Sequence, residues 1–417
     1  MGFKFKVAAV ALAVTGALAA GSAGATNGYF QHGYGLKAKG MAGAGIAFPQ
    51  DALAAATNPA GMVNVGNRID FGADLFRPVR DSRLSFGGAF PAPFNAEYSG
   101  NGDSVFLIPE FGYNHMLTPT SSIGVSVYGN GGMNTSYETL NTATGGVFGT
   151  GKLGVDLSQL FIAPTYSVKV NPRHSLGVSL NLAYQRFKAD GLQNFDNAVF
   201  SSAPGFVTNK GYDTSTGYGL RFGWLGELSP MVSMGATYQT KTRMSSFDKY
   251  RGLFAEQGDF DIPENYGIGI AVKATPATTV AVDVQRINYS KIKSVGNSGN
   301  IAAQLGSSNG PGFGWRDMTV LKVGFSHALN QGLTLRGGIS HGRQPIPSTE
   351  TLFNVLAPGV IESHLTLGAT WTLANKSELT VGYMHGFNKS VTGTGPTAGF
   401  NSKMYQDSLG IAYGWKM

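Results

Sequence analysis

Residues 68–76 read Arg-Ile-Asp-Phe-Gly-Ala-Asp-Leu-Phe and alternate between apolar and polar or small side chains. Ile69 and Phe71 share one face of an extended chain, whereas Asp70 and Asp74 share the other. A period of two is typical of a β-strand. It is also the pattern of a membrane-spanning barrel strand, whose apolar face contacts lipid and whose polar face contacts the lumen.

The same alternation recurs at 176–187, 218–224 and 365–373, and the connections between such segments alternate in length. Six connections are tight, as Pro, Asn and Gly turns require: 117–121, 171–174, 229–231, 275–277, 328–332 and 374–377. Seven are long, polar and glycine-rich: 78–103, 131–154, 189–213, 242–263, 291–316, 343–362 and 389–404. These connections join fourteen antiparallel strands, and in bacterial barrels the short ones face the periplasm. We therefore predict an all-β transmembrane barrel with both chain ends in the periplasm.

The composition supports a barrel and excludes other classes of protein. Charged residues make up 13% of the chain, against about 25% in soluble domains, and 60 residues are glycine. With no cysteine, the chain has no disulfide, thiolate metal site or cysteine nucleophile. The net charge of +7 is spread without a basic stripe, so we expect no nucleic-acid partner.

The first 25 residues have the features of a secretory signal peptide. Lys4 and Lys6 precede an apolar stretch at 7–20, and Ala-Gly-Ala at 23–25 is a small-residue cleavage site. We therefore divide the chain into a signal peptide (1–25), an N-terminal plug (26–65) and a transmembrane barrel (66–417).

Residues 26–65 do not alternate and are rich in glycine and alanine, which suits short helices folded inside a narrow lumen. A disordered leader is the alternative, but its composition would not include Ile46, Phe48, Leu53 and Met62. The segment ends in Asn58, Pro59, Ala60 and Gly61. Because Pro59 disfavours a helical Asn58, we expect the motif to end the last plug helix as a rigid corner.

This organisation resembles the FadL family of outer-membrane transporters for fatty acids and other hydrophobic compounds. The family has an Asn-Pro-Ala motif at the end of a short plug. Later blocks extend the resemblance over the chain: Gly-Phe-Gly-Trp-Arg-Asp at 312–317, Leu-Arg-Gly-Gly at 335–338 and Pro-Ile-Pro at 345–347. The resemblance implies a fourteen-stranded barrel closed by a hatch. The last strand, 405–417, ends on Met417, where such barrels commonly end on an aromatic residue.

The third and fourth long loops carry more large apolar side chains than exposed loops usually hold. They are Leu192, Phe195, Val199, Phe200 and Phe206, then Met244, Phe247, Tyr250, Leu253 and Phe254. Part of each set has the i, i+3, i+7 spacing of one helix face. The loops either pack on each other as a cap or form a hydrophobic capture groove. The resemblance implies that they form a first, weak binding site.

A long-chain acid would also need a cation, ideally an arginine, whose fork matches a carboxylate. Arg186, Arg221, Arg316 and Arg336 lie on or beside predicted strands and are the candidates. For any single one of them, a salt bridge within the lumen is the alternative role.

The third strand loses its alternation at Gly129, Asn130, Gly131 and Gly132. Glycine inside a strand indicates a bulge or kink, although the outward loop could also simply begin here. The resemblance implies an inward kink that opens a lateral gap beside the plug.

No catalytic or metal-binding pattern is convincing. Gly-Ile-Ser-His-Gly at 338–342 matches a nucleophile motif that requires a strand-to-helix turn, but it lies in an alternating strand. The seven histidines are scattered. We therefore expect no enzyme activity, cofactor or metal.

Together these features predict a passive outer-membrane channel for hydrophobic molecules, foremost long-chain fatty acids. Capture in the loop groove and a lumen pocket would precede plug rearrangement and lateral release. Uptake of monoaromatic hydrocarbons, a general diffusion porin and an outer-membrane lipid hydrolase are the alternatives. Outer-membrane lipid, lipopolysaccharide and the barrel-assembly machinery are the expected macromolecular surroundings.

Overall fold

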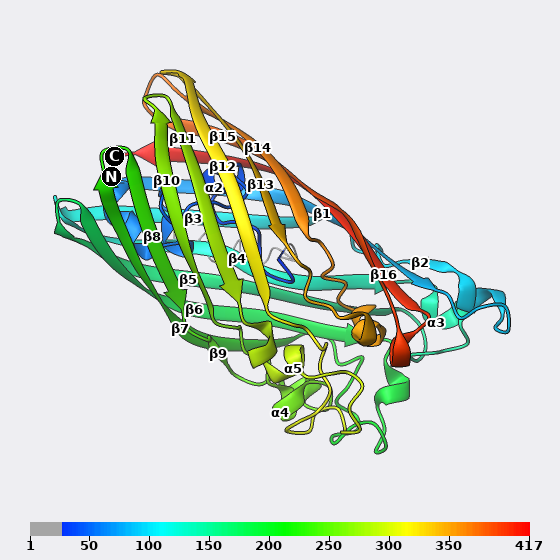
Figure 1. Cartoon of the computed structure of the whole chain (residues 1–417). Coiled ribbons are helices and arrows are strands. Elements are labelled where there is room, and N and C mark those ends of the chain that lie inside the picture. The colour runs from blue at the N-terminus through cyan, green and yellow to red at the C-terminus, as the bar shows by residue number, and fades with distance from the viewer. Residues whose placement is uncertain (1–26) are drawn as a thin grey trace.

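A computed structural model describes residues 27–417, so the predicted signal peptide lies outside the described residues. The chain forms one closed antiparallel barrel of fourteen long strands (Figure 1). Closure comes from β1 and β16, which pair from Arg68 with Lys416 to Leu84 with Phe400. The predicted all-β fold and strand number are therefore confirmed.

The long strands follow one another around the wall in chain order. They are β1 (Arg68–Leu84), β3 (Phe106–Thr118), β4 (Ser121–Tyr137), β5 (Leu153–Asn171), β6 (His174–Asp190), β7 (Asp213–Ser229), β8 (Val232–Gln239), β10 (Asn265–Thr275), β11 (Thr278–Ile287), β12 (Met318–Asn330), β13 (Leu333–Gly342), β14 (Ser363–Thr372), β15 (Glu378–Thr392) and β16 (Phe400–Lys416). Two short strands, β2 (Glu97–Ser99) and β9 (Arg243–Met244), extend the wall at the end that carries the long loops.

Helices are single turns in the N-terminal segment and the long loops. They are α2 (Leu36–Lys39), η1 (Ala54–Ala56), η2 (Pro59–Asn64), η3 (Ala92–Asn95), α3 (Leu140–Ala143), η4 (Gln193–Phe195), η5 (Asp248–Tyr250), α4 (Ala255–Gly258), η6 (Tyr289–Lys291), α5 (Lys293–Gly296), η7 (Ser348–Glu350), α6 (Thr351–Asn354) and η8 (Gly395–Thr397). Within residues 27–417, no helix is long and apolar enough to cross a membrane.

All six predicted tight turns connect neighbouring strands. Three long loops are shorter than predicted, because β1 continues to Leu84, β4 continues to Tyr137, and β15 and β16 reach into 389–404. These extensions lie beyond the apolar band, where outward positions such as Arg77 and Arg83 no longer need to be apolar. Because their outward side chains are not apolar, these residues do not show the alternation that identifies a lipid-facing strand in the sequence.

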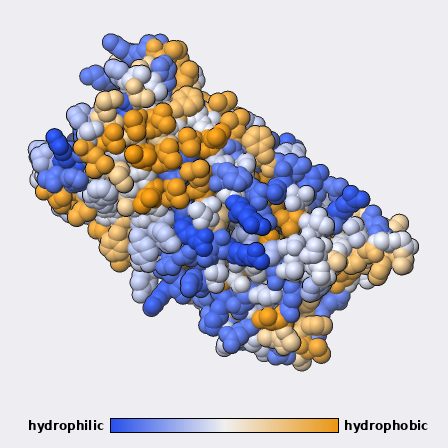
Figure 2. All heavy atoms as spheres, in the orientation of Figure 1, coloured by the Kyte–Doolittle hydropathy of each residue, from blue (hydrophilic) through white to orange (hydrophobic). Residues whose placement is uncertain are grey.

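The alternation of the strands divides the wall into two faces. Leu176, Leu182 and Leu367 point outward and are 46%, 42% and 54% exposed. Ser179 and Asn181, on the opposite face of β6, are fully buried. The outward side chains form the apolar band over β10–β15 that is orange in Figure 2.

Residues 27–66, called the N-terminal segment below, pack against the inner wall of the barrel. Figure 1 shows α2 surrounded by strands near the end of the barrel where the C-terminus lies. The larger apolar core lies at the opposite, long-loop end, where aromatic residues of five loops meet residues 29–34. The lumen is thus filled from both ends.

Candidate functional site

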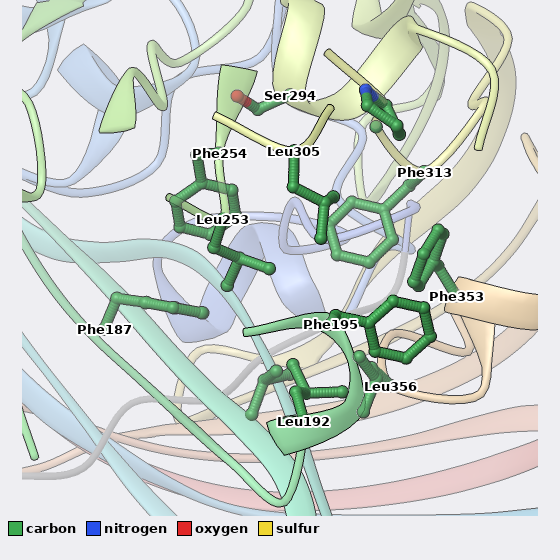
Figure 3. A pocket seen from close by; sticks show the side chains of 13 residues that line it. Phe187, Leu192, Phe195, Leu253, Phe254, Ser294, Leu305, Phe313, Phe353 and Leu356 are labelled. Atoms are coloured by element: carbon green, nitrogen blue, oxygen red, sulfur yellow. The ribbon is translucent and has the colours of Figure 1, made fainter. Parts of the chain in front are cut away.

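An apolar pocket lies at the long-loop end of the barrel. Its lining is almost entirely apolar and contains no charged residue. Its walls are Val155, Phe187, Leu192, Phe195, Leu253, Phe254, Ser294, Leu305, Pro311, Gly312, Phe313, Phe353 and Leu356. Figure 3 shows the rings of Phe195, Phe313 and Phe353 and the surrounding leucines converging on one space. Such a surface binds hydrocarbon by burial of apolar area.

Four of the ten predicted groove residues line this pocket: Leu192, Phe195, Leu253 and Phe254. The other six lie elsewhere. Phe247 and Tyr250 are fully buried beneath it, with ring centroids 5.7 and 4.9 Å from that of Phe187. Met244 is buried in the wall, whereas Val199 and Phe200 are 76% and 49% exposed. Phe206 lies under the Arg251 guanidinium, 3.1 Å from ring centroid to Cζ.

The expected helical faces do not form. Only η4 and η5 are helical at those positions, because Gly191 and Gly205 have positive φ and interrupt the third loop. The i, i+3, i+7 spacing therefore overestimated the helix.

The pocket is also lined by residues of two loops that were not predicted from the sequence to take part in it. Leu305, Pro311 and Phe313 come from the loop before β12, and Phe353 and Leu356 come from the loop before β14. Residues 352–356, Leu-Phe-Asn-Val-Leu, gave a usable apolar signal, whereas Leu305 and Phe313 stand among glycine and serine and gave none.

A belt of amide side chains lines the lumen below the pocket. Asn130 donates a hydrogen bond to Gln159 (2.9 Å), and Gln159 donates one to Gln185 (3.1 Å). Further along the wall, Asn181 donates to Gln239 (3.2 Å). These side chains are fully buried, so each donor needs an acceptor inside the protein.

Three donors in this belt have no hydrogen-bond partner among the described residues: Nε of Arg221, Nε2 of Gln239 and Nδ2 of Asn265. They lie in register on three neighbouring strands, since Arg221 pairs with Gln239 and Gln239 pairs with Asn265. A buried donor without an acceptor costs about 1–3 kcal/mol. Three in one row form an arrangement suited to a group that carries oxygen.

The four candidate arginines separate into two inner and two outer residues. Arg221 donates to the carbonyl of Thr57 (3.2 Å) and to Gln239, and Arg336 donates to Gln50 (2.8 Å) and Thr370 (2.7 Å). Both are buried, and no carboxylate of the described chain forms an ion pair with them. Lumen salt bridges are therefore not their role.

Arg186 faces outward, where its guanidinium lies 4.2 Å from the ring centroid of Tyr212. Arg316 is exposed in the loop before β12. Neither side chain points into the lumen. Arg186 and Arg316 are therefore not placed to bind the carboxylate of a ligand there. Arg186 shares parity with the lipid-facing Leu182, which places it on the outer face of β6.

Carboxylates on the inner wall hold the N-terminal segment. Lys39 forms ion pairs with Asp74 and with Glu110 (3.1 Å for the latter), and Glu110 also accepts from the Leu36 N–H (3.0 Å). Lys37 contacts Glu378 at 2.5 Å. Burial alone would lower the pKa of Lys39, but the two carboxylates outweigh it and raise that pKa. Removing one partner of such a buried pair typically costs about 3–5 kcal/mol.

The wall carboxylates also bind backbone N–H groups of this segment. Asp283 accepts from Gly45 (2.7 Å) and Ile46 (2.9 Å), and Asp70 accepts from Ala52 (2.9 Å). The backbone N–H groups of an irregular segment would otherwise need water as their hydrogen-bond acceptor, and these carboxylates take its place inside the closed lumen.

Asn58 fixes the segment to the wall at the corner formed by residues 58–61. Its Nδ2 donates to the carbonyls of Ile46 (2.7 Å) and Trp224 (2.9 Å), and its Oδ1 accepts from the Ala60 N–H (3.1 Å). A Cβ on Gly223 would lie 2.0 Å from Asn58 Oδ1, so the wall is glycine there. The prediction that the motif ends the last helix is wrong, because Asn58 caps the following turn, η2.

The third long strand, β4, breaks its pairing where the sequence loses alternation. It pairs with β3 only up to Tyr128 with Glu110, whereas its pairing with β5 continues to Tyr137 and shifts register between Gly129 and Gly131. The alternative that an outward loop begins here is wrong, because the strand continues. Past Tyr128, β4 and β3 separate and leave a stretch of β4 edge.

Tyr29–Gln31 of the N-terminal segment occupies part of this edge. Gln31 N–H donates to the Asn130 carbonyl (3.1 Å), and Gly132 N–H donates to the Tyr29 carbonyl (3.0 Å). A Cβ on Gly131 would lie 1.8 Å from that carbonyl, which explains the glycine.

The wall is dented inward at the same place. The outward-facing side chains of Phe111, Val127 and Leu160 are only 5%, 1% and 5% exposed and pack together in one apolar cluster. On β4, four residues before Val127, the side chain of Ile123 is 43% exposed, as expected for a residue that faces lipid. The break in β4 thus joins the N-terminal segment to an apolar depression on the outer face.

The chain matches a known group of proteins over almost its whole length. The model of the outer membrane protein transport family (OMPP1/FadL/TodX) matches residues 15–413. The chain belongs to this family. No curated protein sequence matches it.

Solved structures of similar fold include family transporters. The Pseudomonas putida toluene transporter TodX is 18% identical with a TM-score of 0.72, covering 94% of this chain and 100% of TodX. A Pseudomonas aeruginosa FadL homologue is 15% identical with a TM-score of 0.71, covering 93% and 99%. The Ralstonia pickettii toluene transporter TbuX is 18% identical with a TM-score of 0.65, covering 93% and 99%. At these identities the likeness shows the fold alone.

Members of the family are transport channels and not enzymes, and the one serine–histidine pair in the lumen of the described chain agrees with that. Ser340 Oγ lies 3.1 Å from Nδ1 of His364, a partner that the sequence reading missed by looking only at His341. The other ring nitrogen of His364 meets the Gln406 amide at 3.1 Å and not a carboxylate. A Cβ on Gly338 would lie 2.6 Å from the Met41 backbone, so this glycine serves packing and not a nucleophile turn.

His32 should make the seating of the N-terminal segment sensitive to acid. Burial, with smaller contributions from the Lys39 and Lys322 charges, lowers the pKa of His32 to about 3. The stabilisation that depends on neutral His32 is fully present above about pH 6.5, the ordinary pKa of histidine. It is lost progressively as the pH falls from 6.5 toward the lowered pKa of about 3. We expect the free energy of opening at residues 28–40, from hydrogen exchange corrected for intrinsic rate, to fall by about 1.4 kcal/mol per pH unit below pH 6.

The His32→Gln variant is the control, because glutamine can still donate to the Lys39 carbonyl that Nε2 of His32 contacts at 3.4 Å. Burial raises the pKa of the nearby Asp51 to about 6. The titration of Asp51 therefore changes the pH profile equally in the native protein and in the variant. The predicted result is that the native protein loses protection relative to the variant. Parallel pH profiles would contradict the assignment.

Proposed function

We propose that this chain carries long-chain fatty acids passively across the outer membrane. The family assignment supports the transport of hydrophobic molecules, and the row of donors at Arg221, Gln239 and Asn265 is the observation that carries the choice of substrate. A fatty acid joins an apolar chain to a carboxylate, which accepts up to four hydrogen bonds. The long-loop end faces outward in this proposal, and both chain ends lie in the periplasm.

The route begins at the pocket between the loops. Its walls of leucine and phenylalanine suit the hydrocarbon chain, and the lack of a charged lining residue makes capture independent of the headgroup. From the pocket, the ligand moves inward to the amide belt. There Arg221 supplies a charge and Gln239 and Asn265 supply neutral donors.

Release is lateral and follows movement of the N-terminal plug. Tyr29–Gln31 covers the exposed edge of β4, and the dent beside Phe111, Val127 and Leu160 lies just outside. Withdrawal of 29–31 from Gly131 joins the lumen to that depression. An apolar solute is stabilised by about 25 cal/mol per Å² when it moves from water into lipid, so no energy source is needed.

Uptake of monoaromatic hydrocarbons is the second candidate function. The TodX and TbuX structures are titled as toluene transporters, and the phenylalanine and leucine walls of the pocket suit a small ring as well as an acyl chain. Such a ligand makes no use of the donor row. A general diffusion porin fits poorly, because the N-terminal segment is buried in the lumen.

Pocket binding is tested by two matched truncations in the purified barrel. Leu253→Ala removes an apolar wall, so oleate affinity measured by calorimetry should fall about 10-fold or more, the effect of losing roughly 1.5–3 kcal/mol of burial. Val199→Ala, on an exposed side chain outside the pocket, should leave the affinity unchanged. Equal affinity in all three proteins would place the binding site elsewhere.

The donor row is tested by the near-isosteric substitution Asn265→Leu. We expect oleate binding to weaken by about 10-fold, because a hydrogen bond to a charged group contributes about 1.5–3 kcal/mol. Toluene binding should not change. If oleate never binds and toluene does, the second candidate is correct; if both ligands weaken equally, the row does not recognise oxygen.

A further inference from the structure

The first long loop carries an apolar tip that the proposed route does not use. Between Arg83 and Glu97 the sequence Leu-Ser-Phe-Gly-Gly-Ala-Phe-Pro-Ala-Pro-Phe-Asn-Ala holds no charged residue. Phe90 is 48% exposed at its tip. The Asn95 amide accepts from the Gly87 N–H (2.9 Å) and donates to the Phe90 carbonyl (3.2 Å), so the tip has a defined shape. Figure 1 shows this loop, between β1 and β2, extending past the end of the barrel.

A row of aromatic rings connects the tip to the pocket. Ring centroids are 5.4 Å apart for Phe90 and Phe86, and 5.1 Å apart for Phe86 and Phe400. The row continues through Phe148 to Phe195, with separations of 6.0 and 6.3 Å. Phe195 is a wall of the pocket and lies 5.4 Å from Phe353, another wall. The ring contacts are therefore continuous from an exposed loop to the enclosed site, and Phe148 in the middle of the row is fully buried.

Membrane lipid does not account for this patch. On the outer face of β1, the lipid-facing Leu75 is followed by Arg77, Val79, Asp81 and Arg83, three of which are charged. The nine strand residues between Leu75 and the loop correspond to about 30 Å along the chain. A charged stretch of wall thus separates the tip from the apolar band. Figure 2 shows the same end as a tan surface set apart from the orange band.

We propose that the Phe90 tip is a first contact surface for the hydrocarbon part of the transported solute, and that the packed aromatic row holds this tip in a fixed position beside the pocket. The proposal rests on the proposed function of the pocket. It adds an entry point on the first long loop to the pocket formed by the others. Flat faces and edges of phenylalanine accept both acyl chains and aromatic rings, so this surface selects for apolar character and not for a headgroup.

A tryptophan at the tip provides the direct test, with bromobenzene as the apolar quencher and the mature protein in lipid nanodiscs. The signal is the difference between Phe90→Trp and the native protein, which has four tryptophans. We expect saturable quenching at position 90. The control Ile301→Trp, at an exposed position of another loop, should show only linear, collisional quenching. Linear quenching at both positions overturns the proposal.

Two further arms separate other occupants of the surface. In nanodiscs made with brominated acyl chains and no bromobenzene, quenching of the tryptophan at position 90 would assign the tip to lipid and overturn the proposal. Self-association of the native protein in sedimentation experiments that Phe90→Ser abolishes would assign it to a second copy, with the same consequence. Unquenched, monomeric protein in both arms supports a solute surface.

Uptake of labelled oleate by producing cells distinguishes this proposal from the function it rests on. At oleate concentrations well below saturation, Phe90→Ser should lower the initial rate severalfold, while the rate at saturation stays near that of the native protein. Leu253→Ala should lower uptake in the same assay. A normal rate for Phe90→Ser with a reduced rate for Leu253→Ala overturns only the entry surface; normal rates for both overturn the pocket route as well.

Discussion

The structure depends on charge pairing between a short N-terminal segment and the inner wall of the barrel. Asp70, Asp74, Glu110, Asp283 and Glu378 come from strands far apart in the sequence, and each of them binds this segment or the Arg68 beside it. A buried carboxylate is costly unless it is paired, so the wall and the segment stabilise each other. The same pairing makes movement possible, because a segment held by polar contacts can be released locally without unfolding of the barrel.

The proposed lateral release rests on where the strand ladder is interrupted. A closed barrel has no free edge, but this one exposes an edge where β4 leaves β3 beyond Tyr128. The N-terminal segment supplies hydrogen bonds to that edge through Tyr29 and Gln31. One segment thus fills the lumen and completes the wall. Its withdrawal would open both at once, which couples arrival of a ligand in the lumen to its exit toward lipid.

Much of this could be predicted from sequence, because a barrel strand is a local pattern. The parity of Asp70 and Asp74 placed them in the lumen, and the six tight turns fixed the strand number. The pocket could be predicted only in part. Leu192 and Leu253 belong to loops that looked too apolar, but Phe313 and Phe353 join them through packing between loops, which no local pattern encodes. The donor row at Arg221, Gln239 and Asn265 depends on the register of three strands, which turn lengths and packing set together. The course of β4 past Gly131 was hidden because the glycines at 129, 131 and 132 break the alternation, and because the N-terminal segment, and not β3, pairs with its other edge there.

The most direct measurement is transport with the N-terminal segment locked in place. The chain has no cysteine, so Gly40→Cys with Gly368→Cys introduces a single possible disulfide. A Cβ on Gly40 would lie 3.2 Å from the Gly368 Cα, which is within reach of a disulfide. The account predicts that the oxidised protein still binds oleate but does not transport it, and that reduction restores transport. Equal transport by the oxidised and reduced proteins would contradict it.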